Sequence, residues 1–417
     1  MLLAPPERWR LRTRGWVGLG VPTMPKILYF VPEDWAFVSH FQPMAQAALA
    51  CGLDVVIATR VHQHAEAIIG QGYKLVSLES RRGSLNPLAL LKGILEMMRI
   101  IRAEQPTIVH CVSLPMAVLG GLAARLARRR QIVLALTGLG YVWVERGPIA
   151  AIVRVLVRRI ISHLLRHPET VCVFENAEDP REFGLDPSDP KVVLVGGAGV
   201  DPQAFQCGPE PPAPPVKIAL LARMIRPKGI AEAVAAVRRA RELGAAVELH
   251  LYGAPDPSNR TSCAEADLRR WASDPSIRWH GATDDVARVY REHHIAMLLS
   301  VREGLPKSLV EAAAAGRPIV ATDVPGCREV VRQGREGYLV PFGDIDAAAR
   351  ALVELAGDQA LRLRLGAAAN ARFHERFTVA AVKAVFTDLY RSLLARPGRK
   401  GETEASANPA AALPIQD

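Results

Sequence analysis

The chain has 417 residues, of which 49% are hydrophobic and 23% charged, and its formal net charge is +10. This composition excludes a disordered or fibrous protein, and the length favours two or more domains. The six cysteines lie far apart, without the paired spacing of zinc ligands or of a disulfide framework. We therefore expect free thiols in a reducing compartment.

The amino-terminal segment does not read as a secretory signal. Residues 1–23 carry four arginines but no sustained apolar region and no small-residue cleavage site. Because Met24 directly precedes the first expected strand, we interpret residues 1–23 as a disordered or mis-called extension. The longest uncharged run, residues 106–124, is interrupted by Pro115 and two glycines, and its first half reads as a buried strand. A transmembrane helix is therefore not expected.

Short β-branched segments alternate with helical periodicity along the first half of the chain. The expected strands are residues 26–30, 55–59, 75–78, 107–111, 132–136, 171–174 and 192–195. Because a helical stretch follows each strand, these segments predict βα units in a parallel sheet with helices on both faces. We therefore expect a doubly wound lobe over residues 24–206.

A cluster of arginines lies near the end of this lobe, where residues 122–168 contain nine arginines and one acid. On a helical wheel of residues 149–166, one arc holds Arg154, Arg158, Arg159, Ser162, His163 and Arg166. The other arc holds Val153, Leu156, Val157, Ile160, Ile161 and Leu164. This pattern is typical of a basic amphipathic helix on an anionic membrane, although a solvated surface helix has the same pattern. No aromatic residues alternate with these charges to stack bases, so no nucleic-acid partner is expected.

The composition changes at residues 207–216, where five prolines predict a stiff extended linker. A second alternating series follows, with expected strands at residues 217–221, 247–252, 277–280, 295–300, 319–322 and 338–340. These predict a second doubly wound lobe over residues 217–376, and a cleft between the two lobes at the carboxyl ends of their strands. A helix within residues 377–395 can cross back to the first lobe, and the polar tail at residues 396–417 is expected to be disordered.

The segment from Ser300 to Asp323 carries the chemistry. It leaves a strand, turns at Gly304, has Pro306 at an expected first helical position and stops at Gly316. Free amides and the positive dipole end at such a helix start hold a diphosphate. Glu303 is placed to accept hydrogen bonds from sugar hydroxyls, and Glu311, inside the helix, from the hydroxyls of a ribose.

This segment resembles the E-x7-E signature of retaining glycosyltransferases of family 4. The resemblance extends over residues 25–391 and implies the GT-B fold, an α/β architecture of two Rossmann-like lobes facing a cleft. It implies that Arg223 and Lys228, in the stretch of residues 221–229, stabilise the departing nucleoside diphosphate. Glu303 is the third catalytic residue that it implies. The donor-binding residues that it implies are Gly253, His280, Gly304, Leu305, Pro306, Leu309 and Glu311.

A narrower likeness lies in residues 39–41, 82–87, 136–141 and 325–327, which resemble bacterial galactosaminyltransferases acting on undecaprenyl-diphosphate-linked bacillosamine. It implies a UDP-N-acetylhexosamine-type donor and a polyprenyl-diphosphate-linked glycan acceptor, used in assembling surface polysaccharide or glycoprotein glycans. The sequence departs from the family where Val112 replaces a frequent histidine and where residues 31–35 replace a Gly-Gly loop. Asp34, His40 and His110 are then only candidate acceptor contacts.

The resemblance implies retention at the anomeric carbon and a reaction that needs neither a metal nor a cofactor. An enzyme with this acceptor is expected in the cytoplasm, attached peripherally to the inner face of the membrane through residues 149–166. Two alternatives stay open: a family 4 enzyme with another donor and a soluble acceptor, and a non-catalytic sugar-nucleotide or lipid-glycan binding protein. A nicotinamide dehydrogenase is disfavoured, because no G-x-G-x-x-G follows the first strand.

Overall fold

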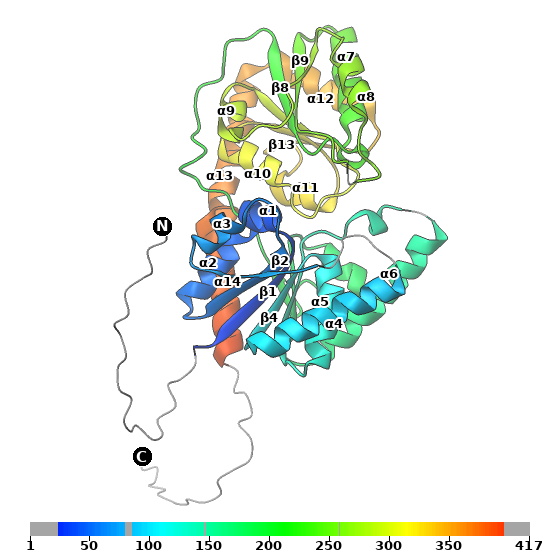
Figure 1. The fold of residues 1–417 in the computed structure, drawn as a ribbon. Helices are drawn as coiled ribbons and strands as arrows, with labels where there is room; N and C mark the ends of the chain where they lie inside the picture. Colours follow the sequence, from blue (N-terminus) through cyan, green and yellow to red (C-terminus); the bar gives the residue numbers. More distant parts are fainter. Residues whose placement is uncertain (1–23, 80–85, 146, 258, 396–417) are drawn as a thin grey trace, which may run out of the picture.

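The computed structural model describes residues 24–79, 86–145, 147–257 and 259–395. They form two lobes, each a parallel sheet with helices on both faces, stacked one above the other in Figure 1. The expected α/β class with two Rossmann-like lobes is confirmed.

The first sheet has seven strands in the order β3-β2-β1-β4-β5-β6-β7. Its strands are β1 Lys26–Glu33, β2 Asp54–Arg60, β3 Lys74–Ser77, β4 Ile108–Val112, β5 Gln131–Leu136, β6 Thr170–Phe174 and β7 Val192–Leu194. Its helices are α1 Asp34–Ala36, α2 Gln42–Ala50, α3 Ala65–Ile69, α4 Pro87–Glu104, α5 Leu114–Leu126 and α6 Pro148–Leu165. Shorter helical turns are η1 Phe37–Phe41, η2 Tyr141–Trp143 and η3 Asp179–Phe183.

The second sheet has six strands in the order β10-β9-β8-β11-β12-β13. Its strands are β8 Val216–Leu221, β9 Val247–Tyr252, β10 Ile277–Trp279, β11 Ile295–Leu298, β12 Ile319–Thr322 and β13 Gly337–Val340. The turn η4 Arg226–Lys228 follows β8, and the helices of this lobe are α7 Ile230–Glu242, α8 Glu265–Trp271, α9 Val286–Arg291, α10 Lys307–Ala314, α11 Pro325–Val330, α12 Ile345–Gly357 and α13 Gln359–Arg376. The chain ends its described part with α14 Val379–Ala395.

Burial explains why the strands could be predicted from the sequence. Helices cover both faces of each sheet, so central strands such as β4, β5 and β6 are buried along their whole length. Helix starts follow their capping residues: Asn86 caps α4 ahead of Pro87, and Asp285 caps α9 by accepting a hydrogen bond from the amide of Arg288.

The uncharged run at residues 106–124 divides into β4 and the first part of α5, as its strand-like first half indicated. In the described part of the chain, no helix combines the length and apolar character needed to cross a bilayer.

The last helix, α14, packs against the first lobe although it follows α13 of the second lobe (Figure 1). Its apolar side chains join the core formed by β1, β4 and α2. The Tyr390 hydroxyl contacts the Tyr29 hydroxyl at 2.8 Å and Nδ1 of His110 at 3.0 Å. The chain thus crosses between the lobes twice, through the linker and through the α13–α14 junction.

Candidate active site

The loop between β11 and α10 lies at the carboxyl edge of the second sheet and faces the first lobe. Pro306 is the residue before α10 rather than its first residue, so the helix begins one position later than the sequence indicated. Nζ of Lys228, on the turn after β8, lies 2.6 Å from Oε1 of Glu303. The side chain of Glu303 is only 9% exposed, so the pair is held in place mostly out of contact with water.

Gly304 allows a close approach between the lobes. A Cβ atom on Gly304 would lie 2.7 Å from Oε2 of Glu175 and 3.0 Å from Gly138, and both of these residues belong to the first lobe. From the other side, a Cβ on Gly326 would meet the Gly304 carbonyl at 2.4 Å. Only glycines fit here, and the start of α10 is therefore pressed directly against the first lobe.

Glu311 lies inside α10 with its carboxylate largely buried. Burial raises the pKa of Glu311, against the effect of Lys307, whose Nζ is 3.5 Å from Oε1 of Glu311. Nζ of Lys307 also donates a hydrogen bond of 3.0 Å to the carbonyl of Ser39 in the first lobe. Leu309, a predicted donor-binding residue, packs in the core beneath the helix with 1% of its surface exposed.

Arg223 and Gly253 lie on neighbouring loops after β8 and β9. The guanidinium of Arg223 is half exposed and pairs with Asp256 at 2.8 Å. Gly253 has φ of +143°, and a Cβ there would lie 1.9 Å from the Ala222 carbonyl, so the loop requires glycine. The two loops therefore pack closely enough to hold Arg223 near the turn that carries Lys228.

His280 stacks on Tyr252, with ring centroids 4.5 Å apart and an interplanar angle of 7°. Burial, followed by the charge of Arg278, lowers the pKa of His280, with Glu292 acting in the opposite direction. The pair forms a flat neutral surface on the loops of the second lobe, and contact of His280 with the donor stays a prediction.

The three candidate acceptor residues have different positions. His40 lies near the cations of the second lobe: burial, then the charges of Lys307, Lys228 and Arg223, lower its pKa to about 4. Its ring also lines a narrow cavity at the carboxyl ends of β4, β5 and β6. Of the three, it is the one that the structure brings within reach of the charges of Lys228 and Arg223, the predicted catalytic cations.

Asp34 and His110 are not where an acceptor contact requires them. Asp34 is buried, and although burial opposes it, hydrogen bonds from the amides of His62, His64 and Trp35 lower its pKa. His110 is fully buried against Tyr390 of α14, and burial lowers its pKa to about 3. Both side chains are buried inside the first lobe, and we correct their assignment as acceptor contacts accordingly.

A row of polar contacts joins the two lobes after β6. The Asn176 amide donates to the Gly304 carbonyl at 3.0 Å, and Asp179 forms an ion pair with Arg302. Next to them, Glu178 pairs with Arg328 at 2.8 Å. Because the first-lobe partners all follow β6, the end of this strand is the main polar bridge to the second lobe.

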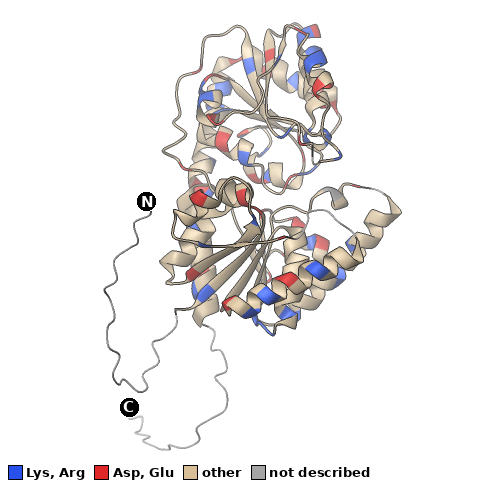
Figure 2. Cartoon of the chain, viewed as in Figure 1, with Lys and Arg blue, Asp and Glu red and all other residues tan. Residues whose placement is uncertain are grey.

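The helical wheel predicted that the arginines of α6 share one exposed face. This prediction is wrong for Arg154 and Arg158, which are partly buried. Arg154 donates hydrogen bonds of 2.7 Å to the carbonyls of Val142 and Glu145, and Arg158 pairs with Glu182 at 2.5 Å. The exposed surface of α6, here the α6 face, is instead apolar in its first half and basic in its second. Its larger side chains are Ile149, Ile152, Val155, Leu156, Arg159 and His163, together with Arg166 directly after the helix. Figure 2 shows the charged segments at this edge of the first lobe.

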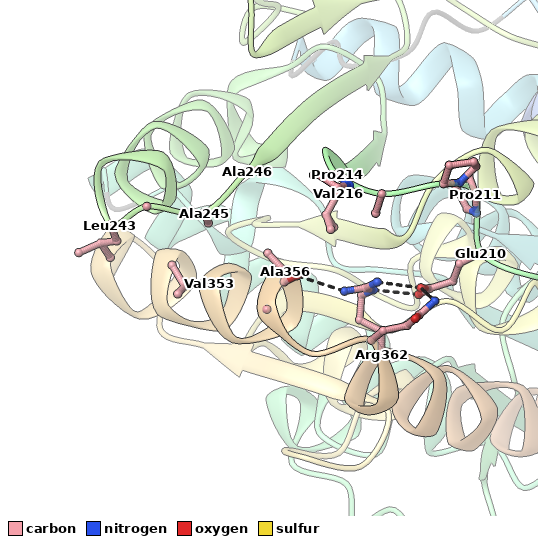
Figure 3. Close-up of a pocket in the computed structure, with 15 residues that line it drawn as sticks. Glu210, Pro211, Pro214, Val216, Leu243, Ala245, Ala246, Val353, Ala356 and Arg362 are labelled. Carbon is pink, nitrogen blue, oxygen red and sulfur yellow. Dashed lines mark hydrogen bonds and ion pairs between the residues drawn. The ribbon is translucent and has the colours of Figure 1, made fainter.

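A groove in the second lobe lies away from this site. Figure 3 shows it between the linker and the ends of α7 and α12, with Glu210, Leu243 and Ala356 among its lining residues. It is at the amino-terminal ends of β8 and β9, opposite the edge that carries Arg223 and Gly253. Among the described residues, no group of three or more His, Cys, Asp or Glu side chains is arranged to hold a metal ion.

Two family models match the chain in succession. The model described as glycosyl transferase 4-like matches residues 26–173, and the model described as glycosyl transferases group 1 matches residues 215–358. Together with the paired sheets and the facing loops, these matches define the class: the chain is a glycosyltransferase of the two-lobed GT-B type.

One similar curated protein is the N,N'-diacetylbacillosaminyl-diphospho-undecaprenol alpha-1,3-N-acetylgalactosaminyltransferase of Campylobacter jejuni. It is 23% identical over 352 residues, which cover 81% of this chain and 91% of that protein. Sucrose-phosphate synthase from Thermosynechococcus elongatus has a TM-score of 0.73 at 18% identity, over 89% of this chain and all of that one. The Anabaena protein HepE, solved with UDP and glucose, has a TM-score of 0.68 at 16% identity, over 88% of this chain and 100% of that one. At these identities the two structures support the fold alone.

Sequence reasoning missed the residues that join the lobes. No role was predicted for Glu175, Asn176, Asp179 or Lys307, although each of them contacts the opposite lobe. Their position in the sequence could have indicated a role for three of them. Residues 175–179 directly follow a buried parallel strand, and ligand-binding residues are common at the carboxyl ends of such strands.

Proposed function

We propose that this glycosyltransferase moves an N-acetylhexosamine-type sugar from a UDP-sugar to a polyprenyl-diphosphate-linked glycan, in surface polysaccharide or glycoprotein glycan assembly. The observation that carries the proposal is the Lys228–Glu303 pair in front of α10, where the charge of Lys228 also acts on His40 of the first lobe. The acceptor follows from the similarity to the Campylobacter jejuni enzyme, whose name contains an undecaprenol diphosphate and which this chain matches over 91% of its length.

The proposed mechanism depends on positive charge at the leaving group. When the sugar departs, negative charge develops on the nucleoside diphosphate, and fixed cations stabilise that state more than the bound substrate. Lys228, Arg223 and the amino-terminal end of α10 supply that charge here. The anomeric carbon then has oxocarbenium character, as in glycosyl transfer generally. An acceptor hydroxyl attacks the anomeric carbon from the face that the diphosphate leaves, and a donor phosphate oxygen takes up its proton. This gives retention without a side-chain nucleophile.

We further propose that the reaction needs no metal ion, because these groups supply the charge that a cation would bring. Turnover is therefore expected to be unchanged after treatment with a chelator. Activity that a chelator abolishes and only a divalent ion restores would contradict this proposal.

A panel of UDP- and GDP-sugars tests the activity. Each is incubated with the protein, once with a polyprenyl-diphosphate glycan and once with a soluble sugar acceptor, and release of nucleoside diphosphate is measured. We expect release from a UDP-N-acetylhexosamine that depends on the lipid-linked acceptor. Release with the soluble sugar alone favours the alternative acceptor, and binding without any release favours a non-catalytic binding protein.

We also propose that the enzyme attaches peripherally to the inner face of the membrane through the α6 face. Ile149 and Ile152 are 69% and 68% exposed, and with the exposed Val155 and Leu156 they form an apolar patch on one helix. Such residues enter the headgroup boundary, while the arginines of the second half attract an anionic leaflet by roughly 1 kcal/mol each. A polyprenyl acceptor stays in the bilayer, so its enzyme has to reach that surface.

The membrane proposal is tested by sedimenting the protein with anionic and with neutral vesicles. We expect binding to anionic vesicles that falls with salt, and loss of most binding in the double variant Arg159→Gln with Arg166→Gln. The matched control is Arg269→Gln with Arg270→Gln, which removes the same charge from exposed positions on α8 of the second lobe. Wild-type binding that is the same for anionic and neutral vesicles would contradict this proposal. An equal loss of vesicle binding in the control variant would contradict it as well.

A further inference from the structure

Glu175, at the end of β6, touches the start of α10 from the first lobe. Its Oε2 lies 2.7 Å from the position of a Cβ on Gly304, and its carboxyl interacts with the backbone N–H of Leu305. On its other side the same residue lines the narrow cavity that also contains His40 and Thr137. The carboxyl therefore lies at one of the amides that the second lobe offers to the donor's diphosphate.

A carboxylate at this position would oppose the function proposed for the site. It would compete with the diphosphate for the Leu305 amide and repel it, whereas a neutral carboxylic acid has an O–H that donates a hydrogen bond to a phosphate oxygen. We propose that Glu175 is a donor-binding residue contributed by the first lobe, which contacts the diphosphate of the nucleotide-sugar as a neutral carboxylic acid. This inference depends on the nucleotide-sugar function proposed above.

The surroundings of Glu175 favour its protonated form. Burial, then the charges of Asp179 and Glu303, raise its pKa to about 8, against the hydrogen bond from the Leu305 amide. The nearby cations are engaged, since Arg302 pairs with Asp179 and Lys228 with Glu303. His40, with its pKa near 4, is neutral across the pH range that matters here. Glu175 is therefore the group facing this space that titrates between pH 7 and 9.

The sign of the pH effect follows from linkage. A bound diphosphate brings negative charge beside Glu175 and raises its pKa further, so the complex holds the proton more tightly than the free protein. Donor affinity is then complete below the pKa of the free protein and falls as the pH rises above about 8. One pH unit above that pKa, the loss is about tenfold.

The test measures the dissociation constant of UDP by titration calorimetry between pH 7 and pH 9. We expect wild-type affinity to fall about tenfold over this range, and Glu175→Gln, which is neutral and keeps a hydrogen-bond donor, to bind with little pH dependence. Glu175→Ala should bind more weakly at pH 7 than either. The control Glu178→Gln removes the neighbouring contact with Arg328 and should keep the wild-type pH profile.

A second measurement uses the wild-type protein alone, so the test does not depend on the stability of a variant. Binding of UDP at pH 8, measured in two buffers of different ionisation enthalpy, should take up a fraction of a proton. Affinity that is independent of pH, or that falls equally in Glu175→Gln, would overturn the role of Glu175 and leave the donor site intact. Failure of wild type to bind either UDP or GDP would instead overturn the donor site itself, and this inference with it.

Discussion

Lys228→Ala is expected to lower kcat by about 10²- to 10³-fold, the typical effect of removing one group that stabilises a developing charge. The ammonium of Lys228 lies 2.6 Å from Glu303 in the loop before α10, where the diphosphate is proposed to leave. Because the charge to be stabilised appears mainly in the transition state, the KM for the donor should change much less. Steady-state kinetics with varied nucleotide-sugar separate the two parameters.

The control is Arg226→Ala, which removes one positive charge from an exposed position on the same turn. It should leave kcat within a small factor of wild type. If Lys228→Ala weakened donor binding and turnover equally, Lys228 would be a ground-state contact, and its proposed role in the departure of the diphosphate would be wrong.

Arg362→Met is expected to destabilise the fold by about 3–5 kcal/mol, the usual cost of leaving one member of a buried ion pair without its partner. Arg362 on α13 and Glu210 in the linker have side chains that are 4% and 3% exposed, 2.8 Å apart (Figure 3). The guanidinium also donates a hydrogen bond of 2.7 Å to the carbonyl of Leu355. Chemical denaturation measures the loss in free energy of unfolding.

Two controls define this result. Adding Glu210→Leu to Arg362→Met removes the unpaired carboxylate and should recover much of the lost stability. Arg269→Ala, which breaks an ion pair on the surface of α8, should cost less than about 1 kcal/mol because the Arg269 and Glu265 side chains are 74% and 55% exposed. If Arg362→Met lowered the free energy of unfolding no more than Arg269→Ala does, the Arg362–Glu210 pair would not stabilise the position of the linker.

The sequence was most informative where burial is uniform. Every strand that was expected is present, with ends shifted by three residues at most, since a parallel strand covered on both faces is apolar along its length. The start of α10 was predicted to within one residue, because Gly304 and Pro306 limit where that helix can begin. Both predictions succeeded because they depend on residues that are neighbours in the sequence.

The errors came from packing between segments far apart in the chain. His110 follows a pattern that suggests a cleft residue, yet α14, 280 residues later at Tyr390, covers it. A helical wheel assigned Arg154 and Arg158 to solvent, but the turns η2 and η3, outside the helix, accept their hydrogen bonds. Glu175 acquires its setting only when the loop of Gly304 approaches from the other lobe. No local pattern contains that information.

The most direct test of the central claim is the mass of the lipid product. Wild-type protein is incubated with UDP-N-acetylhexosamines and a polyprenyl-diphosphate-linked glycan, beside Lys228→Ala as a matched control, and the lipid fraction is analysed by mass spectrometry. We expect a product heavier by one N-acetylhexosamine residue, formed by wild type and strongly reduced in the variant. An unchanged lipid acceptor with every UDP-sugar, or equal product from Lys228→Ala, would contradict the proposed reaction and its site.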